Sequence, residues 1–348
     1  MDRAPNRDYA IDLLKVMAII GVIIIHTCPA GYNYPIGSFN WLSTLFWGVL
    51  MRSCVPVFLM CSGALFLEPR TELTLKKLYL KNLLRILVSM FFWAMAYKVY
   101  HLVQEGNFTA ALLYRGFLDV LLFRQEFHLY YLHIIILVYI FVPIMRIITQ
   151  NADKAQLQYL LLVWAVFGIV YPTVRPFWPF RLLSGIPEHW LMNMTYASIG
   201  YGVLGHYLKR YPNESARLYV LMFAAGFAFV FAGTWFLSFR RGYLYEGFLE
   251  GMTIGPALMA AGVFGFCESR FKASNPKLAR TVMYLSQASF CVYLVHAFVL
   301  YGFSKAGLTA SLFPCLVSIP AIAALNYACC NGIYAALSRI PIARKWLI

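Results

Sequence analysis

Long apolar runs constrain this chain more than any other feature of its sequence. A hydrocarbon core about 30 Å thick takes roughly 20 apolar residues per helix. Because the chain shows no strand pattern, internal repeat or Pro/Gly-rich linker, we expect an all-α, polytopic membrane protein with a single domain over residues 1–348. About ten transmembrane helices are predicted, at 9–29, 44–67, 83–102, 129–149, 157–174, 189–208, 217–238, 248–267, 282–303 and 311–333.

The composition excludes an ordinary soluble protein. Only 12% of the residues are charged and 61% are hydrophobic, whereas a soluble domain carries about a quarter charged residues. The net charge of +15 comes from 29 Lys and Arg against 14 Asp and Glu. These basic residues stand between the apolar runs, where they set topology and contact anionic lipid. We therefore expect membrane lipid as a partner and no nucleic acid.

The distribution of Lys and Arg predicts how the helices are oriented. With the N-terminus inside, twenty of the 29 basic residues fall on the cytoplasmic side, among them Arg3, Arg7 and Arg70. An even number of spans returns the C-terminus to the same side, so both termini are predicted to be cytoplasmic. The loop after the third span contains an amphipathic stretch, 110–123, that we expect in the membrane interface.

The first apolar run contains three ionisable residues, which are costly at membrane depth and are therefore functional candidates. Asp12 and Lys15 lie near the inner boundary, three residues apart and on one helix face, where they can pair. His26 lies about 25 Å further along the helix from residue 9, in the outer third of the span. Two interpretations of His26 stay open: a reactive group, or an interfacial histidine that hydrogen-bonds to a neighbouring helix.

The second run places Arg52 about 12 Å below the outer surface. Lipid cannot solvate a guanidinium there, so Arg52 needs a partner or a water-filled cavity. It is either half of a structural ion pair, with Glu126 or Glu188, or an electrophilic contact to a reacting group. Further along the same run, Ser62 and Gly63 are small enough to permit close helix approach, which favours a packing role.

Six of the seven histidines fall at or near the outer half of the predicted helices: His26, His101, His128, His133, His189 and His296. An outward cluster of histidines suits proton transfer. No histidine pair has the spacing of a helical metal motif, and the eight cysteines show no CxxC pattern, so no metal is expected. On the inner side, Arg85 suits bidentate binding of a phosphate, with positive-inside topology as the simpler alternative.

Four blocks, in order along essentially the whole chain, resemble the integral-membrane acyltransferase family 3. They are Asp12-x-x-Lys15-x10-His26, residues 52–63, residues 127–131 followed by Pro143, and residues 289–296. Two departures stand out: Lys15 occupies a position where the family has Arg, and the Arg-x-x-Arg of the third helix reads Asn82-x-x-Arg85 here. The layout is most similar to the branch that contains the enterobacterial common antigen O-acetyltransferase.

The resemblance implies a membrane enzyme that moves an acyl group, usually acetyl, from cytoplasmic acyl-CoA to a hydroxyl of a cell-envelope glycan or glycolipid. It also implies a location in the bacterial cytoplasmic (inner) membrane. No cofactor is expected to be bound permanently, since acetyl-CoA enters as the donor substrate. The expected catalytic residues are His26, as general base, and Arg52. The expected substrate contacts are Asp12, Lys15, Ser62, Arg85, His128, Tyr293 and His296.

Other functions stay open at this stage. A transporter or flippase of an envelope lipid or glycan would share the basic inner rim and the polar residues at membrane depth. Against it, the sequence shows no inverted repeat and no matched pair of broken helices. A non-enzymatic sensor or assembly subunit on the same scaffold is a third alternative. A homo-oligomer is compatible with all three.

Overall fold

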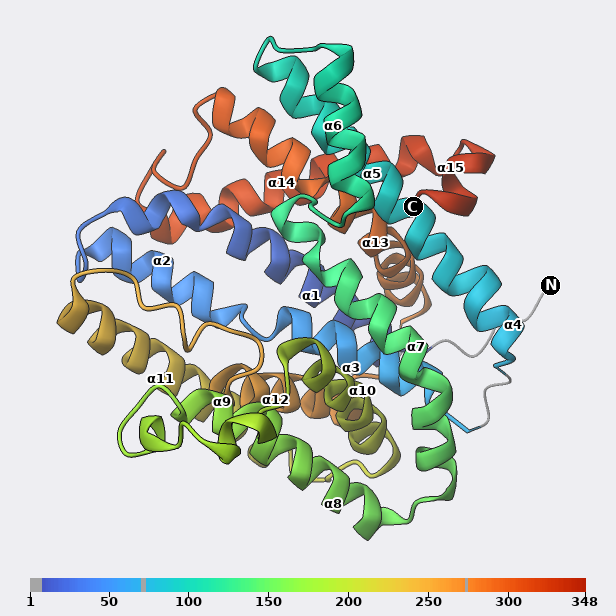
Figure 1. Cartoon of the computed structure of the whole chain (residues 1–348), viewed down its shortest axis with the longest axis vertical. Coiled ribbons are helices and arrows are strands. Elements are labelled where there is room, and N and C mark those ends of the chain that lie inside the picture. The colour runs from blue at the N-terminus through green and yellow to red at the C-terminus, as the bar shows by residue number, and fades with distance from the viewer. Residues whose placement is uncertain (1–7, 70–72, 273–274) are drawn as a thin grey trace.

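The computed structural model describes residues 8–69, 73–272 and 275–348, and every regular element within them is helical (Figure 1). Arg3, Arg7 and Arg70 lie outside the described residues. The α-helices are α1 (Tyr9–Thr27), α2 (Phe39–Leu50), α3 (Cys54–Phe66), α4 (Leu75–Lys77), α5 (Leu84–Gln104), α6 (Ala110–Leu121), α7 (Tyr130–Asn151), α8 (Lys154–Trp164), α9 (Tyr171–Val174), α10 (Met194–Arg210), α11 (Ala216–Arg241), α12 (Ile254–Arg270), α13 (Pro276–Lys305), α14 (Cys315–Leu337) and α15 (Pro341–Trp346). Short 3-10 or π-helical segments are η1 (Pro29–Asn33), η2 (Leu78–Leu83), η3 (Phe127–Leu129), η4 (Ala165–Val170), η5 (Phe180–Leu182) and η6 (Ile186–Trp190).

Eight helical segments of the described residues are long and apolar enough to cross a membrane. They are Tyr9–Asn33, Phe39–Phe66, Leu75–Gln104, Phe127–Asn151, Lys154–Val174, Ala216–Arg241, Pro276–Lys305 and Cys315–Leu337. The other two predicted spans correspond to α10 and α12, which have 17 residues each. The all-helical, multi-span prediction is therefore confirmed. The count of ten and the cytoplasmic termini stay predictions.

Local hydrogen bonds explain why α10 and α12 begin later than the apolar runs predict. Asn193 caps α10, because its side chain accepts a hydrogen bond from the backbone N–H of Thr195 at 2.9 Å. The preceding residues form η6 instead. At the start of α12, the backbone N–H of Ile254 donates to the hydroxyl of Thr173 at 3.0 Å. Both helices therefore start five or six residues after the predicted boundaries of 189 and 248.

The second span is broken at residues 51–53, which separate α2 from α3. A proline inside a helix lacks the N–H that would bind the carbonyl four residues earlier, and its ring crowds that carbonyl. Pro56 stands four residues after Arg52, so the helical ladder is interrupted at Arg52 itself. The span also begins earlier than predicted, at Phe39, because the Ser38 side chain accepts a hydrogen bond from Trp41 at 3.3 Å and caps α2.

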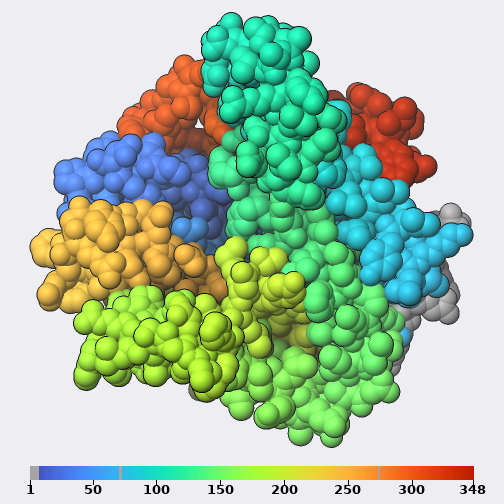
Figure 2. Space-filling view, in the orientation of Figure 1, coloured from blue at the N-terminus to red at the C-terminus, as the bar shows by residue number. Residues whose placement is uncertain are grey.

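Helix α1 lies at the centre of the packed core, where it contacts α3, α12, α13 and α14. Most of its residues are buried, whereas few residues of α11 at the periphery are. In the space-filling view, α6 and α7 form a band down the face turned to the viewer (Figure 2). The candidate residues of α1, Asp12, Lys15 and His26, therefore lie on a helix that other helices surround.

The packing role predicted for Gly63 agrees with its surroundings. A Cβ on Gly63 would stand 1.9 Å from the carbonyl oxygen of Gly202, and a Cβ on Gly205 would stand 2.2 Å from that of Met60. These distances are far shorter than any real contact, so only glycine permits α3 and α10 to cross this closely. Most of the interfacial stretch predicted over 110–123 forms α6, which ends at Leu121 and has exposed apolar side chains. Its depth in the membrane stays a prediction.

Candidate active site

Three of the seven histidines meet at one place in the core. His26 lies in the last turn of α1, His128 in η3 and His296 in the second half of α13. The ring centroids of His26 and His128 each lie 5.0 Å from that of His296, and 6.4 Å from each other. The other histidines, which are His101, His133, His189 and His206, do not belong to this cluster.

A hydrogen bond joins two of the three rings. The Nδ1 atom of His26 lies 2.7 Å from the Nε2 atom of His296. The other nitrogen of His296, Nδ1, lies 2.7 Å from the backbone carbonyl of Tyr293. His296 is completely buried, whereas His26 is only partly buried. Of the bonded pair, only His26 therefore retains accessible surface.

His128 is held by its backbone. Its carbonyl accepts a hydrogen bond from the Tyr293 hydroxyl at 2.5 Å. Its ring is buried, and neither ring nitrogen has a hydrogen-bond partner among the described residues. The ring of Tyr97 packs edge-on against it, with the centroids 4.9 Å apart. Phe127, which is 56% exposed, packs against the ring of His26 at 5.2 Å.

Arg52 carries a positive charge at the break between α2 and α3. Its Nε atom is buried without a hydrogen-bond partner within the described residues. The ion pair considered from the sequence, with Glu126 or Glu188, is wrong. Glu126 is bonded instead to His101 and Tyr301, and Glu188 to Arg175.

The model of an acyltransferase domain, acyltransferase family 3, matches residues 8–334. The chain belongs to this family. No curated protein and no solved structure matches it. The match includes all three clustered histidines and Arg52, and together with the apolar helices it makes the chain a multi-pass membrane acyltransferase. The resemblance to the family is thereby confirmed, whereas the branch stays a prediction.

Three further residues that the family blocks marked lie on α1 and α3. Asp12 is buried, and one of its carboxylate oxygens accepts a hydrogen bond from the Ser286 hydroxyl at 2.6 Å. Lys15 is partly exposed one turn further along α1. The Ser62 hydroxyl donates to the carbonyl of Phe58 in its own helix at 3.0 Å. Asp12 lies about 21 Å along α1 from His26, so this acyltransferase has two separate groups of polar residues on one helix.

Arg85 binds the end of the described chain. Its guanidinium donates to the carbonyl of Ile348 and lies 5.7 Å from the ring centroid of Phe290. One and two turns further along α5, the Ser89 hydroxyl and the Trp93 indole donate to the carbonyls of Trp346 and Leu347, at 2.7 and 2.8 Å. Three consecutive carbonyls thus bind to one face of α5, which lies beside α15 in Figure 1.

Two residues that sequence reasoning missed also support the cluster. The Tyr97 hydroxyl donates to the carbonyl of Leu294 at 2.9 Å, and the Asn326 side chain donates to the carbonyl of His296 at 3.0 Å. Both hold α13 in place around His296. A buried asparagine in an apolar run is itself an unusual feature, so Asn326 could have been found from the sequence. Tyr97 is one of 24 tyrosines and offered no such signal.

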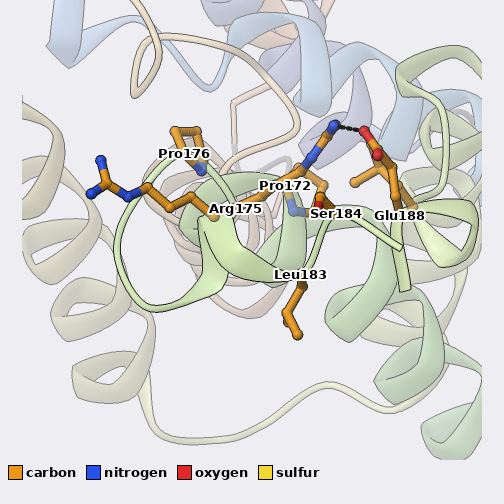
Figure 3. Close-up of a pocket in the computed structure, with 8 residues that line it drawn as sticks. Pro172, Arg175, Pro176, Leu183, Ser184 and Glu188 are labelled. Carbon is orange, nitrogen blue, oxygen red and sulfur yellow. Dashed lines mark hydrogen bonds and ion pairs between the residues drawn. The ribbon is translucent and has the colours of Figure 1, made fainter. Parts of the chain in front are cut away.

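A cavity of about 390 Å³ lies in the segment between α9 and α10 (Figure 3). It is lined by Pro172, Arg175, Pro176, Arg181, Leu183, Ser184, Glu188 and Leu191. An ion pair between Arg175 and Glu188 crosses its edge. None of the clustered histidines lines it. Among the described residues, no group of three or more His, Cys, Asp or Glu is arranged to hold a metal ion.

Proposed function

We propose that this family member is a membrane O-acyltransferase that moves an acyl group, usually acetyl, from cytoplasmic acyl-CoA to a hydroxyl of a cell-envelope glycan or glycolipid. The observation that carries the proposal is the state of His26. One of its ring nitrogens is bound to a buried histidine, while the residue is partly exposed. A positioned imidazole of this kind is a suitable general base near neutral pH.

In the proposed reaction, His26 removes the proton from the acceptor hydroxyl as the oxygen attacks the thioester carbonyl of the acyl-CoA. The negative charge that develops on the carbonyl oxygen is stabilised by the Arg52 guanidinium, whose Nε has no other partner among the described residues. The carbon–sulfur bond then breaks, and the thiolate of CoA takes the proton from His26. The products are the acyl ester and free CoA, with His26 neutral again.

The remaining contacts are assigned by position. We place the CoA phosphates near Lys15 and Arg85 on the cytoplasmic side, with Asp12 and Ser62 on the path between them and His26. His128 and Tyr293 border the acceptor. Because Arg85 is bonded to Ile348, donor binding there requires the segment after α14 to move. The proposed location is the bacterial cytoplasmic (inner) membrane, and the proposed branch is that of the enterobacterial common antigen O-acetyltransferase.

The test uses membranes that contain the wild type, His26→Ala or His26→Gln at matched protein levels, incubated with radiolabelled acetyl-CoA and envelope acceptors. His189→Ala is the matched control, because His189 is exposed and lies outside the cluster. We expect label to pass to a lipid or glycan with the wild type and the control. Both His26 variants should lose transfer by roughly 100-fold or more, while membrane insertion stays unchanged.

Chromatography of the labelled product identifies the acceptor and its acyl linkage. Equal transfer by wild type and His26→Gln would remove His26 from the mechanism. An absence of transfer with every variant, with acceptors present, would instead favour the transporter or flippase. That alternative is checked by measuring movement of the envelope lipid across vesicles without acyl-CoA.

A further inference from the structure

A general base works only if the nitrogen that faces the substrate carries a lone pair. In neutral histidine either nitrogen can hold the proton, and the wrong choice leaves no base. We propose that His296 is a positioning residue that holds His26 in the tautomer with the proton on Nδ1 and the lone pair on Nε2. The role in catalysis rests on the proposed function, whereas the tautomer itself does not.

The assignment of protons begins at the backbone. A carbonyl oxygen can only accept a hydrogen bond, so the Nδ1 of His296 that lies 2.7 Å from the carbonyl of Tyr293 must carry a proton. In neutral His296, Nε2 then carries only a lone pair. The Nδ1 of His26, 2.7 Å away, must therefore donate to it. This leaves Nε2 of His26 without a proton and available to remove one from the acceptor.

Burial separates the roles of the two histidines. His296 is completely buried and both of its nitrogens are bonded, so it has no atom left for a substrate. Its backbone is fixed as well, because Asn326 from α14 donates to its carbonyl. The family resemblance implied that His296 contacts the substrate. We assign it instead a role that acts through His26.

The ionisable groups around the pair come from several elements. The other ionisable groups nearby are His128 from η3, Tyr97 from α5, Tyr293 from α13 and Arg52 from the break in the second span. Within the described residues, no carboxylate forms a hydrogen bond or ion pair with either ring. In serine hydrolases a carboxylate orients the histidine. Here a backbone carbonyl does so through a second imidazole, which avoids a buried negative charge at membrane depth.

The tautomer can be observed directly by solid-state NMR on full-length protein with 15N-labelled histidine in lipid bilayers. At a pH where the pair is neutral, we expect His26 to show a protonated Nδ1 and an unprotonated Nε2. The signals are assigned by their loss in His26→Gln. In His296→Leu, which removes the acceptor, His26 should become a mixture of both tautomers.

Kinetics provides the second readout. His296→Leu should lower kcat roughly 100-fold while the KM for acetyl-CoA stays unchanged. His296→Gln should restore kcat to within about tenfold of the wild type, because its side-chain oxygen can accept the Nδ1 proton of His26. The matched controls are His206→Leu and His206→Gln, since His206 on α10 is equally buried but remote from the cluster. Both controls should retain kcat, and thermal unfolding in detergent reports on folding.

Three outcomes would overturn the inference: a protonated Nε2 in wild-type His26, unchanged kcat in His296→Leu, or equal loss in the Leu and Gln variants of His296. If His296→Leu does not fold, the tautomer of His26 in the wild type and the kcat of His296→Gln still test the inference. A wild type with the expected tautomer but no transfer activity would overturn the proposed function, while supporting the orientation of His26 by His296.

Discussion

The histidine cluster and the Arg85 face of α5 both place polar side chains within apolar helices, but their hydrogen bonds go to different partners. In the cluster, His26 bonds to another side chain, His296, and keeps one ring nitrogen available. On α5, Arg85, Ser89 and Trp93 bond to backbone carbonyls of the chain itself. The cluster keeps a ring nitrogen available, whereas the three side chains on α5 each bind a backbone carbonyl and, among the described residues, leave only the Arg85 Nε without a partner.

This difference shows that a sequence motif identifies residue types but does not tell whether their side chains already bind another part of the chain. A basic residue inside a span has to find acceptors, because lipid offers none. Arg85 has found one in the carbonyl of Ile348, which any anionic donor would have to replace. His26 faces no such competition. We therefore expect changes in the cluster to act on the rate of the chemical step, and changes on α5 to act on donor binding.

The largest effect is expected from Arg52, which acts on developing charge. Arg52→Gln should lower kcat roughly 100- to 1000-fold, as loss of one oxyanion donor does in other enzymes. Arg52→Lys keeps the positive charge but loses the planar guanidinium with its several donors, so it should retain part of kcat. Initial rates with saturating acetyl-CoA provide the measurement. Arg124→Gln is the control, because Arg124 is exposed between α6 and η3. A wild-type kcat in Arg52→Gln would exclude this role.

A smaller effect, on KM rather than kcat, is expected at Arg85. A hydrogen bond to a charged group contributes about 1.5 to 3 kcal/mol, so Arg85→Gln should raise the KM for acetyl-CoA roughly 10- to 100-fold. The rate at saturation should change little. Substrate titration of both Arg85→Gln and Arg85→Lys checks this. A fall in kcat without a change in KM would contradict the assignment of Arg85 to donor binding, since it would place Arg85 in the chemical step.

Weakening the attachment of residues 341–348 to α5 should change the KM for acetyl-CoA in the opposite direction. Ser89→Ala combined with Trp93→Phe removes two hydrogen bonds to the carbonyls of residues 346 and 347, at about 1 kcal/mol each. Hydrogen exchange in residues 341–348 should become faster, and the KM for acetyl-CoA should fall a few-fold because Arg85 is released. Ser269→Ala is the control, since its hydroxyl bonds only within its own helix. Faster hydrogen exchange with an unchanged KM would show that residues 341–348 and acetyl-CoA do not compete for Arg85.

An effect of similar, modest size is expected beside the cluster, at Glu126. Its carboxylate binds His101 at 3.0 Å and Tyr301 at 2.7 Å, and it directly precedes Phe127, which packs on His26. Glu126→Gln should lower kcat/KM for the acceptor roughly fivefold, in line with about 1 kcal/mol per hydrogen bond. Tyr301→Phe removes one of the two bonds and should lower it less. An effect as large as that of Arg52→Gln would mean that Glu126 takes part in the chemistry.

Much of the helical scaffold could be predicted because an apolar run is a property of neighbouring residues in the sequence. Every predicted span contains a helix, and the errors lie at boundaries set by particular caps such as Asn193 and Ser38. The interruption at Arg52 was also readable, because Pro56 stands four residues later. The absence of an ion pair between Arg52 and Glu126 or Glu188 could not be predicted, since it depends on which partners those carboxylates find in the folded chain. In the folded chain Glu126 contacts His101, and Glu188 contacts Arg175.

The sequence by itself determined the class of protein: apolar runs long enough to cross a membrane, and ordered blocks that carry His26, Arg52, His128 and His296. Tertiary structure decided what those residues do to one another. His26 and His296 are 270 positions apart, and their hydrogen bond exists only because α1 and α13 pack together. The pairing of Arg85 with Ile348 likewise joins distant segments. Hydrophobic periodicity reports on a helix and its surroundings, whereas a hydrogen bond between helices depends on distances of a few ångströms that only packing sets.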